Sequence, residues 1–331
     1  MAPIISLSAT MTSRQSLSVR LPLPAATPHL TGNCELTVPP HSADLALALR
    51  LADAADAIST PPFRSADLLV EIKGDGSPVT VVDRAVETMM QKIVLQERPQ
   101  DSFLGEEIGP HGSGPRRWIF DGIDGTHNYA AGVAAWATMI ALEIDGEVQL
   151  GVVSSPCGGV RWYAERGAGS WRLEAAHHDG VVTSFHDSVP TRLMCTNTEV
   201  FDDANVLPVP PEGFMLGWRS TLAGELLRGT ASNSRTYAYY GAAVAEGLLD
   251  ATIILNGGPW DFAANTVIVE EAGGEYRDPW GGRRLDTNCI VFTNGKLTQH
   301  ILAIARPLLP ATPDVGHRNP DWRTPPGTFT P

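Results

Sequence analysis

The chain has 331 residues, 43% of them hydrophobic, enough for the core of one large domain or of two closely packed ones. No apolar run reaches the roughly 18 residues of a membrane-spanning helix, so the sequence predicts a soluble protein with no membrane partner. A formal net charge of -13 at pH 7 repels nucleic-acid backbones and argues against a nucleic-acid partner. The four cysteines are scattered, which indicates neither a zinc site nor a disulfide scaffold and predicts a cytoplasmic location.

The two ends of the chain differ in composition from the middle. Residues 1–42 are rich in Ser, Thr, Pro and Leu, with basic residues at Arg14 and Arg20 and no acidic residue before Glu35. We expect a disordered extension there, with a start at Met11 or an organelle transit peptide as the open alternatives. The tail, residues 306–331, holds seven prolines and is expected to be irregular.

Between these ends the pattern predicts a mixed α/β fold. A possible N-cap at Ser42 and an apolar face predict a helix over 42–59, and a second helix is expected over 83–96. Helix and strand signals alternate again beyond residue 190. Strand-like runs lie at 117–121, 137–144, 148–154 and 160–164, with Asp145-Gly146 marking a hairpin between the second and third of them.

The most informative stretch runs from Trp118 to Thr126, where a predicted strand leads into Asp121, Asp124 and a Gly125-Thr126 turn. Carboxylates three positions apart on a turn can converge on one point, and Mg²⁺ prefers such hard oxygens together with phosphate oxygens and water. The N–H groups of Gly125 and Thr126 are candidate phosphate donors at a helix start. An Asx-turn that closes a hairpin explains the same residues without a metal.

Two further acidic motifs occur on either side of this stretch. Gly105-Glu106-Glu107 precedes it, and Trp260-Asp261 follows it at the start of an apolar helical pattern that Gly273-Gly274 closes. Taken singly, Glu106 could be a solvated loop acid and Asp261 a helix N-cap. In this order the three motifs resemble the inositol monophosphatase family of metal-dependent phosphatases, over roughly residues 43–300. Within the family, the histidinol-phosphatase-like branch is the most similar, judged from the segments Trp136–Leu142 and Val244–Gly247.

The resemblance implies a layered α/β/α/β/α sandwich, which we divide near Pro156. Residues 43–155 would carry most metal ligands, and residues 156–305 would supply Asp261 and much of the substrate pocket. It also implies a homodimer and two or three Mg²⁺ ions per site. The implied metal ligands are Glu106, Asp121, the Ile123 carbonyl, Asp124 and Asp261.

The resemblance also implies the groups that orient the attacking water. Thr126 would position it, and Asp83, in Pro78-Val79-Thr80-Val81-Val82-Asp83, matches the family residue that pairs with this threonine. A helix-capping role is the alternative for Asp83. Asp75 lies in a loop that approaches an optional third metal in the family, although a simple turn acid is equally consistent.

The chain departs from the family at the turn and in the substrate pocket. Gly122 replaces the usual proline between the two aspartates, which removes a conformational restraint but no ligand. Seven positions before Asp261, Ile254 replaces a Glu that grips a polar group of inositol or histidinol phosphate. Arg235 is another candidate pocket residue. Close to it in the sequence, Tyr237 replaces an Asp that pairs with an amine in histidinol-phosphatase-like relatives.

We therefore predict Mg²⁺-dependent hydrolysis of a small-molecule phosphomonoester, with the alcohol portion open. Histidinol phosphate and a nucleoside or modified-sugar monophosphate are the candidate substrates. The alternatives are an inositol-phosphate phosphatase, or a non-catalytic regulatory or binding protein that keeps the fold. His177 and His178, with His186 nearby, lack the helical spacing of a zinc motif and are expected to be solvated.

Overall fold

The computed structural model describes residues 42–74, 76–178, 181–186, 188–209, 217–228 and 239–313, with backbone only at 176–178, 181–184 and 228. The predicted extension, apart from Ser42, and the tail from residue 314 therefore lie outside the described residues. So do Asp75, Arg235 and Tyr237. The described residues all belong to one compact unit. None of the helices in the described ranges is long and apolar enough to cross a membrane.

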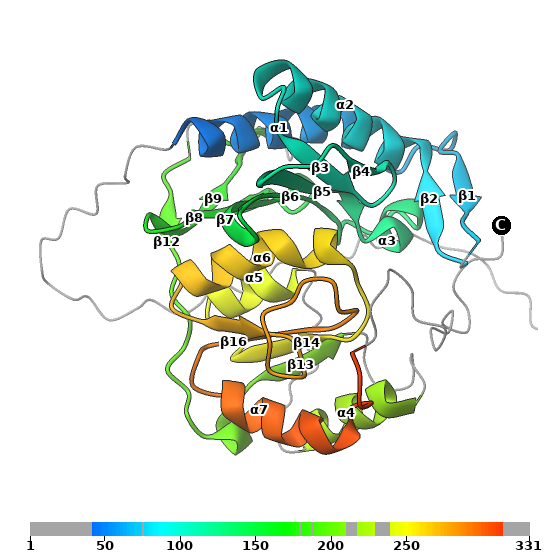
Figure 1. The fold of residues 1–331 in the computed structure, drawn as a ribbon. Helices are drawn as coiled ribbons and strands as arrows, with labels where there is room; N and C mark the ends of the chain where they lie inside the picture. The colour runs from blue at the N-terminus through cyan, green and yellow to red at the C-terminus, as the bar shows by residue number, and fades with distance from the viewer. Residues whose placement is uncertain are drawn as a thin grey trace, which may run out of the picture. The chain divides into compact units, whose positions relative to one another are not determined.

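An eight-stranded mixed sheet forms the larger of the two main layers of strands (Figure 1). Its order is β12-β9-β8-β7-β6-β5-β3-β4, with β3 and β5 parallel and the other neighbours antiparallel. The strands are β3 (Ser102–Gly105), β4 (Gly109–His111), β5 (Arg116–Asp124), β6 (Ala137–Ile144), β7 (Glu147–Ser155), β8 (Val160–Glu165), β9 (Gly169–Glu174) and β12 (Thr191–Arg192). The predicted hairpin between β6 and β7 is confirmed, and both of its turn residues have positive φ, 53° at Asp145 and 81° at Gly146.

Two helices, α1 (Ala43–Ser59) and α2 (Val81–Glu97), cover one face of this sheet (Figure 1). Both predicted helices are therefore confirmed. The Ser42 hydroxyl accepts the Leu45 N–H at 3.0 Å and caps α1. Thr80 and Asp83 form a capping box that starts α2. Between β1 (Val70–Ile72) and its partner β2 (Pro78–Thr80) lies the loop that contains Lys73.

A middle layer of two helices, α5 (Tyr240–Ala245) and α6 (Pro259–Glu271), separates the large sheet from a second sheet (Figure 1). Because α6 packs on both sides, nearly every residue from Pro259 to Val269 is buried. The helix also lies close to β7, where a Cβ on Gly151 would be 2.3 Å from the Ala264 carbonyl oxygen. Only glycine fits at that approach.

The second sheet has four strands in the order β13-β14-β16-β15, and helices α4 and α7 cover its outer face. Its strands are β13 (Val206–Val209), β14 (Ala251–Ile254), β15 (Glu275–Arg277) and β16 (Ile290–Thr293). The remaining elements are α4 (Gly217–Arg228), α7 (Thr298–Ala305), the hairpin β10 (Ala176–His178) with β11 (Val181–Ser184), and the 3-10 helices η1 (Phe201–Asp203) and η2 (Arg306–Leu308).

The order of these layers confirms the predicted α/β/α/β/α sandwich. The division near Pro156 stays a prediction, although the large sheet continues past it to Arg192. The tail does not begin as irregular structure, because Arg306–Leu308 form a 3-10 turn.

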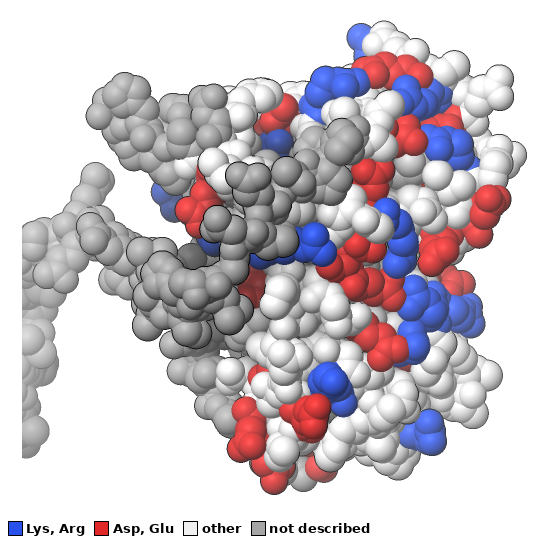
Figure 2. Space-filling model, turned by 90° about the vertical axis from the view of Figure 1, so that its left-hand side faces the viewer, with Lys and Arg blue, Asp and Glu red and all other residues white. Residues whose placement is uncertain are grey.

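Charged side chains of both signs are interspersed over the face shown in Figure 2. Among the described residues, Glu270 pairs with Arg166 at 2.7 Å and with Arg283 at 2.5 Å. Such pairing leaves little net positive field for a polyanion around these residues. The absence of a nucleic-acid partner stays a prediction.

Candidate active site

The two aspartates of the central motif lie at the end of β5, which continues to Asp124. The expected turn between them is therefore wrong. Instead, the register against β6 shifts, because Asp121 pairs with Met139 and Asp124 pairs with Ala137. One extra residue on β5 forms a bulge. Residues three apart on a regular strand face opposite sides, and this bulge allows both carboxylates to line one pocket.

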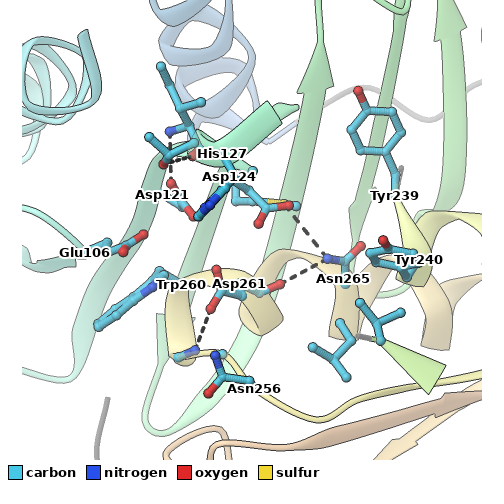
Figure 3. Close-up of a pocket in the computed structure, with 18 of the residues that line it drawn as sticks. Glu106, Asp121, Asp124, His127, Tyr239, Tyr240, Asn256, Trp260, Asp261 and Asn265 are labelled. Atoms are coloured by element: carbon cyan, nitrogen blue, oxygen red, sulfur yellow. Dashed lines mark hydrogen bonds between the residues drawn. The ribbon is translucent and has the colours of Figure 1, made fainter. Parts of the chain in front are cut away.

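The three acidic motifs converge at this strand end. Glu106 follows β3, Asp121 lies in β5 and Asp261 lies in the first turn of α6. Carboxylate oxygens of these three residues lie within 4.8 Å of one another. Asp124 is outside that group but lines the same pocket, and Figure 3 shows all four side chains around one space. The sequence motifs, far apart along the chain, thus form one acidic cluster.

Burial and mutual repulsion make the carboxylates of Asp121, Asp124 and Asp261 hard to ionise. Burial raises the pKa of Asp121 well above its usual range, and Glu106, Asp261 and Asp124 raise it further. Burial, then Asp124 and Glu106, similarly raise the pKa of Asp261, although the Gly258 N–H opposes the shift. Burial and Glu106 raise the pKa of Asp124 to about 7. A cation among these groups would relieve both penalties.

The residues present fit a divalent metal of the Mg²⁺ type. The side-chain donors are all carboxylate oxygens, and the Ile123 carbonyl oxygen lies 3.1 Å from the Thr126 hydroxyl at the same pocket. The described structure also places a cation there, since Lys73 Nζ lies 2.8 Å from Glu106 Oε1 and also bonds Glu107. Burial opposes the charge on Lys73, but both glutamates act to raise its pKa.

Thr126 and Asp83 meet beside the acidic cluster. The Thr126 hydroxyl donates to Asp83 Oδ1 at 2.8 Å, while Asp83 Oδ2 accepts the Thr80 N–H at 2.9 Å. Asp83 therefore both caps α2 and contacts Thr126, so the two interpretations of this residue are compatible. Burial raises the pKa of Asp83, although hydrogen bonds from Thr80 and Thr126 oppose the shift.

Gly125 starts the short helix α3 (Thr126–Ala130). Its φ of 85° is left-handed, and a Cβ would lie 3.1 Å from the Ala135 carbonyl oxygen, so glycine is required there. The Gly125 N–H interacts with the Asp124 carboxylate and lowers its pKa. Phosphate binding by the Gly125 and Thr126 N–H groups stays a prediction.

Sequence reasoning missed Glu87, which is fully buried behind the cluster. Its carboxylate accepts main-chain N–H groups from the Glu106 loop and from Gly122. Burial raises its pKa to about 7, although the N–H groups of Ile108 and Glu107 oppose the shift. Glu87 lies four positions after Asp83, on the same face of α2, so helical spacing could have indicated it.

The cluster opens into a cavity of about 390 Å³ whose far side is less acidic. Ile254 lines that side, as do Tyr239 and Tyr240. Asn265, also in the lining and missed by sequence reasoning, donates from Nδ2 to the Asp261 carbonyl at 3.2 Å. Its Oδ1 is buried without a hydrogen-bond partner among the described residues. Figure 3 shows the Asn265 amide on the side of the pocket where the two tyrosines lie.

The chain is similar to known proteins over most of its length. A model of the inositol monophosphatase family matches residues 43–309. The chain belongs to this family. The inositol monophosphatase family is metal-dependent. Relatives of the chain named histidinol-phosphatase and inositol-1-monophosphatase are phosphoric monoester hydrolases, and the chain is a phosphoric monoester hydrolase.

Relatives and solved structures share most of their length with this member of the inositol monophosphatase family. A histidinol-phosphatase from Streptomyces coelicolor is 36% identical, over 80% of this chain and 97% of its own length. An inositol-1-monophosphatase from Rhizobium meliloti is 29% identical, over 74% of this chain and 89% of its own length. The structure of an IMPase from Thermotoga maritima, 23% identical, covers 80% of this chain and 97% of its own, with a TM-score of 0.67, and shares the fold.

Proposed function

We propose that this phosphatase uses Mg²⁺ to hydrolyse a small-molecule phosphomonoester to the alcohol and phosphate. The observation that carries the proposal is the convergence of Glu106, Asp121 and Asp261 beside the hydrogen-bonded pair of Thr126 and Asp83. Such a site combines an all-oxygen cation site with a hydroxyl and a proton acceptor for water. Metal identity and number, the dimer and the cytoplasmic location stay predictions.

The proposed metal ligands are the five groups predicted from the sequence: Glu106, Asp121, the Ile123 carbonyl, Asp124 and Asp261. When bound, the metal would neutralise the phosphate charge, make water a stronger nucleophile and support the leaving oxygen. Asp121, which has a carboxylate oxygen within 4.8 Å of carboxylate oxygens of both Glu106 and Asp261, would contact more than one ion.

Thr126 and Asp83 orient and deprotonate the attacking water in this proposal. Because the Thr126 hydroxyl donates to Asp83 Oδ1, its lone pairs can accept a hydrogen bond from water. Burial raises the pKa of Asp83, which makes this carboxylate a better proton acceptor than an exposed aspartate. The proton of the water would pass through the Thr126 hydroxyl to Asp83.

The alcohol side of the pocket favours a hydroxylated group over a strongly cationic one. Every carboxylate in the described lining belongs to the proposed metal set, and Ile254 holds the position of the family's gripping Glu. Asn265 Oδ1 offers an acceptor for a hydroxyl, while Tyr239 and Tyr240 offer aromatic surface. These features support a nucleoside or modified-sugar monophosphate, whereas the 36% identity to a histidinol-phosphatase supports histidinol phosphate.

The test is phosphate release from a panel of sugar, polyol, amino-alcohol and nucleoside monophosphates, each with Mg²⁺ and with EDTA. We expect at least one ester to be hydrolysed rapidly with Mg²⁺ only, and the ranking to identify the alcohol. Selectivity for myo-inositol 1-phosphate would favour the inositol-phosphatase alternative. Tight metal-dependent binding of these esters without turnover would favour the non-catalytic alternative and contradict the proposal.

A further inference from the structure

Four main-chain N–H groups surround the buried carboxylate of Glu87. Its Oε1 accepts the N–H of Glu106 at 3.1 Å and that of Gly122 at 3.4 Å. Its Oε2 accepts the N–H groups of Glu107 and Ile108, both at 3.0 Å. A carboxylate offers about four lone-pair sites, so this one is close to saturated by backbone donors.

These donors belong to the two segments that carry most of the acidic cluster. Glu106 follows β3, and Gly122 lies between Asp121 and Ile123 in β5. One side chain on α2 therefore joins the Glu106 loop to the β5 strand end from behind the pocket. Asp83, one turn earlier on α2, accepts a hydrogen bond from the side-chain hydroxyl of Thr126. The helix thus contacts three parts of the site, which are the Glu106 loop, the end of β5 and Thr126.

We propose that Glu87 is a positioning residue, which fixes the Glu106 loop against the Asp121–Asp124 segment and so sets the metal affinity of the site. Glu87 does not line the pocket, so it acts through the main chain of the ligands. This role rests on the metal site of the proposed function. Burial and the neighbouring acids Glu106 and Glu107 disfavour a charged carboxylate here, and the converging N–H groups oppose this effect.

The glycines around Glu87 agree with this role. A Cβ on Gly105 would lie 2.3 Å from Glu87 Oε2. A Cβ on Gly122 would lie 2.8 Å from the Asp83 carbonyl oxygen and 3.2 Å from Glu87 Cγ. The glycine in Asp-Gly-Ile-Asp therefore allows α2 to sit closely against β5. It also supplies an N–H that the proline usual at this position lacks.

The test replaces Glu87 with glutamine and measures Mg²⁺ binding by calorimetry on metal-free protein, alongside kcat and the Mg²⁺ concentration for half activity. Glutamine keeps the shape but has one acceptor oxygen, and its NH₂ group would face N–H donors. We expect Mg²⁺ affinity about 10 to 100 times weaker, as for other residues that orient metal ligands. At saturating Mg²⁺, kcat should largely recover, which a loss of folding would not allow.

Two further variants make the result decisive. Glu97→Gln changes the same residue type on the same helix, at an exposed ion pair with Arg50, and should leave Mg²⁺ affinity unchanged. Gly122→Ala should weaken Mg²⁺ binding through the crowded Cβ, and it carries the test if Glu87→Gln does not fold.

Normal Mg²⁺ binding by Glu87→Gln, or a lost kcat at unchanged affinity, would overturn the positioning role alone. If Glu87→Gln does not fold, normal Mg²⁺ binding by Gly122→Ala would overturn it. A wild-type protein that binds no divalent cation would instead overturn the proposed function, and this role with it.

Discussion

Replacing Asp121 with asparagine should stabilise the metal-free protein while destroying its function. Asp121 is 2% exposed, and its carboxylate lies within 4.8 Å of carboxylate oxygens of Glu106 and Asp261. At an effective dielectric constant of about 20, each ionised pair at that distance repels by about 3.5 kcal/mol. Protonation relieves much of this repulsion, since the pKa of Asp121 is raised. We therefore expect a net gain of about 1–3 kcal/mol at pH 8, a fraction of one such pair.

Adding Mg²⁺ should reverse the order of stability. A ligand at 100 times its Kd stabilises the folded state by about 2.7 kcal/mol, and each kcal/mol shifts Tm by about 1–2 °C in a chain of 331 residues. The wild type should gain this stabilisation, whereas Asp121→Asn should lose most of it. Its turnover should fall at least about a thousandfold, as for other principal electrostatic groups in catalysis.

The assay is thermal unfolding of both proteins with EDTA and with Mg²⁺, with Asp202→Asn as the control at an exposed aspartate. The control should follow the wild type in both conditions. A lower Tm for Asp121→Asn in EDTA, or an equal Mg²⁺ shift in the two proteins, would show that Asp121 is not part of a repulsive cation site.

Three other results are expected. Thr126→Ala should lower kcat by a factor of about 10² to 10⁴ with Mg²⁺ affinity retained, because it removes water orientation only. Calorimetry and kinetics on one preparation check this, and a normal kcat would contradict the role of Thr126 in orienting water. The folded-state pKa of Asp124 is raised from 3.8 to about 7, so the metal-free protein should lose stability as pH rises through 7, while its Mg²⁺ affinity increases. Measurements of Tm and of the Mg²⁺ Kd from pH 5.5 to 8.5 check both signs. A Tm of the metal-free protein that rises with pH would contradict them. Ile254→Glu should impair the native reaction through a partly buried, unpaired carboxylate but shift relative kcat/KM toward amino-alcohol or polyol phosphates. An unchanged ranking of the panel substrates would show that residue 254 does not determine substrate selectivity.

Individual helices and strands could be predicted because their signals are local, whereas the layered sandwich and the set of metal ligands were implied by the resemblance to the family. The N-cap at Ser42 and the alternating strands around Asp145-Gly146 depend on neighbouring residues. The ordered acidic motifs identified the three carboxylates that converge. The bulge between Asp121 and Asp124 could not be predicted, since it is defined by pairing with β6 rather than by residues of β5.

Contacts between distant segments could not be predicted from the sequence either. Lys73 contacts Glu106 across 33 positions, and Glu87 contacts Gly122 across 35. A polar residue in an apolar helix, such as Asn265, looks ordinary until the pocket that it lines is known. These residues depend on which elements pack together, and a pattern of side chains along one element does not carry that information.

The most direct test of the central claim is hydrolysis of the best panel substrate in H₂¹⁸O, with metal-free enzyme and after Mg²⁺ is restored. We predict no phosphate release without metal. Restored turnover should place one ¹⁸O in the released phosphate and none in the alcohol, because water attacks phosphorus. Full turnover by the metal-free enzyme, or ¹⁸O in the alcohol, would contradict metal-dependent phosphomonoester hydrolysis at this acidic cluster.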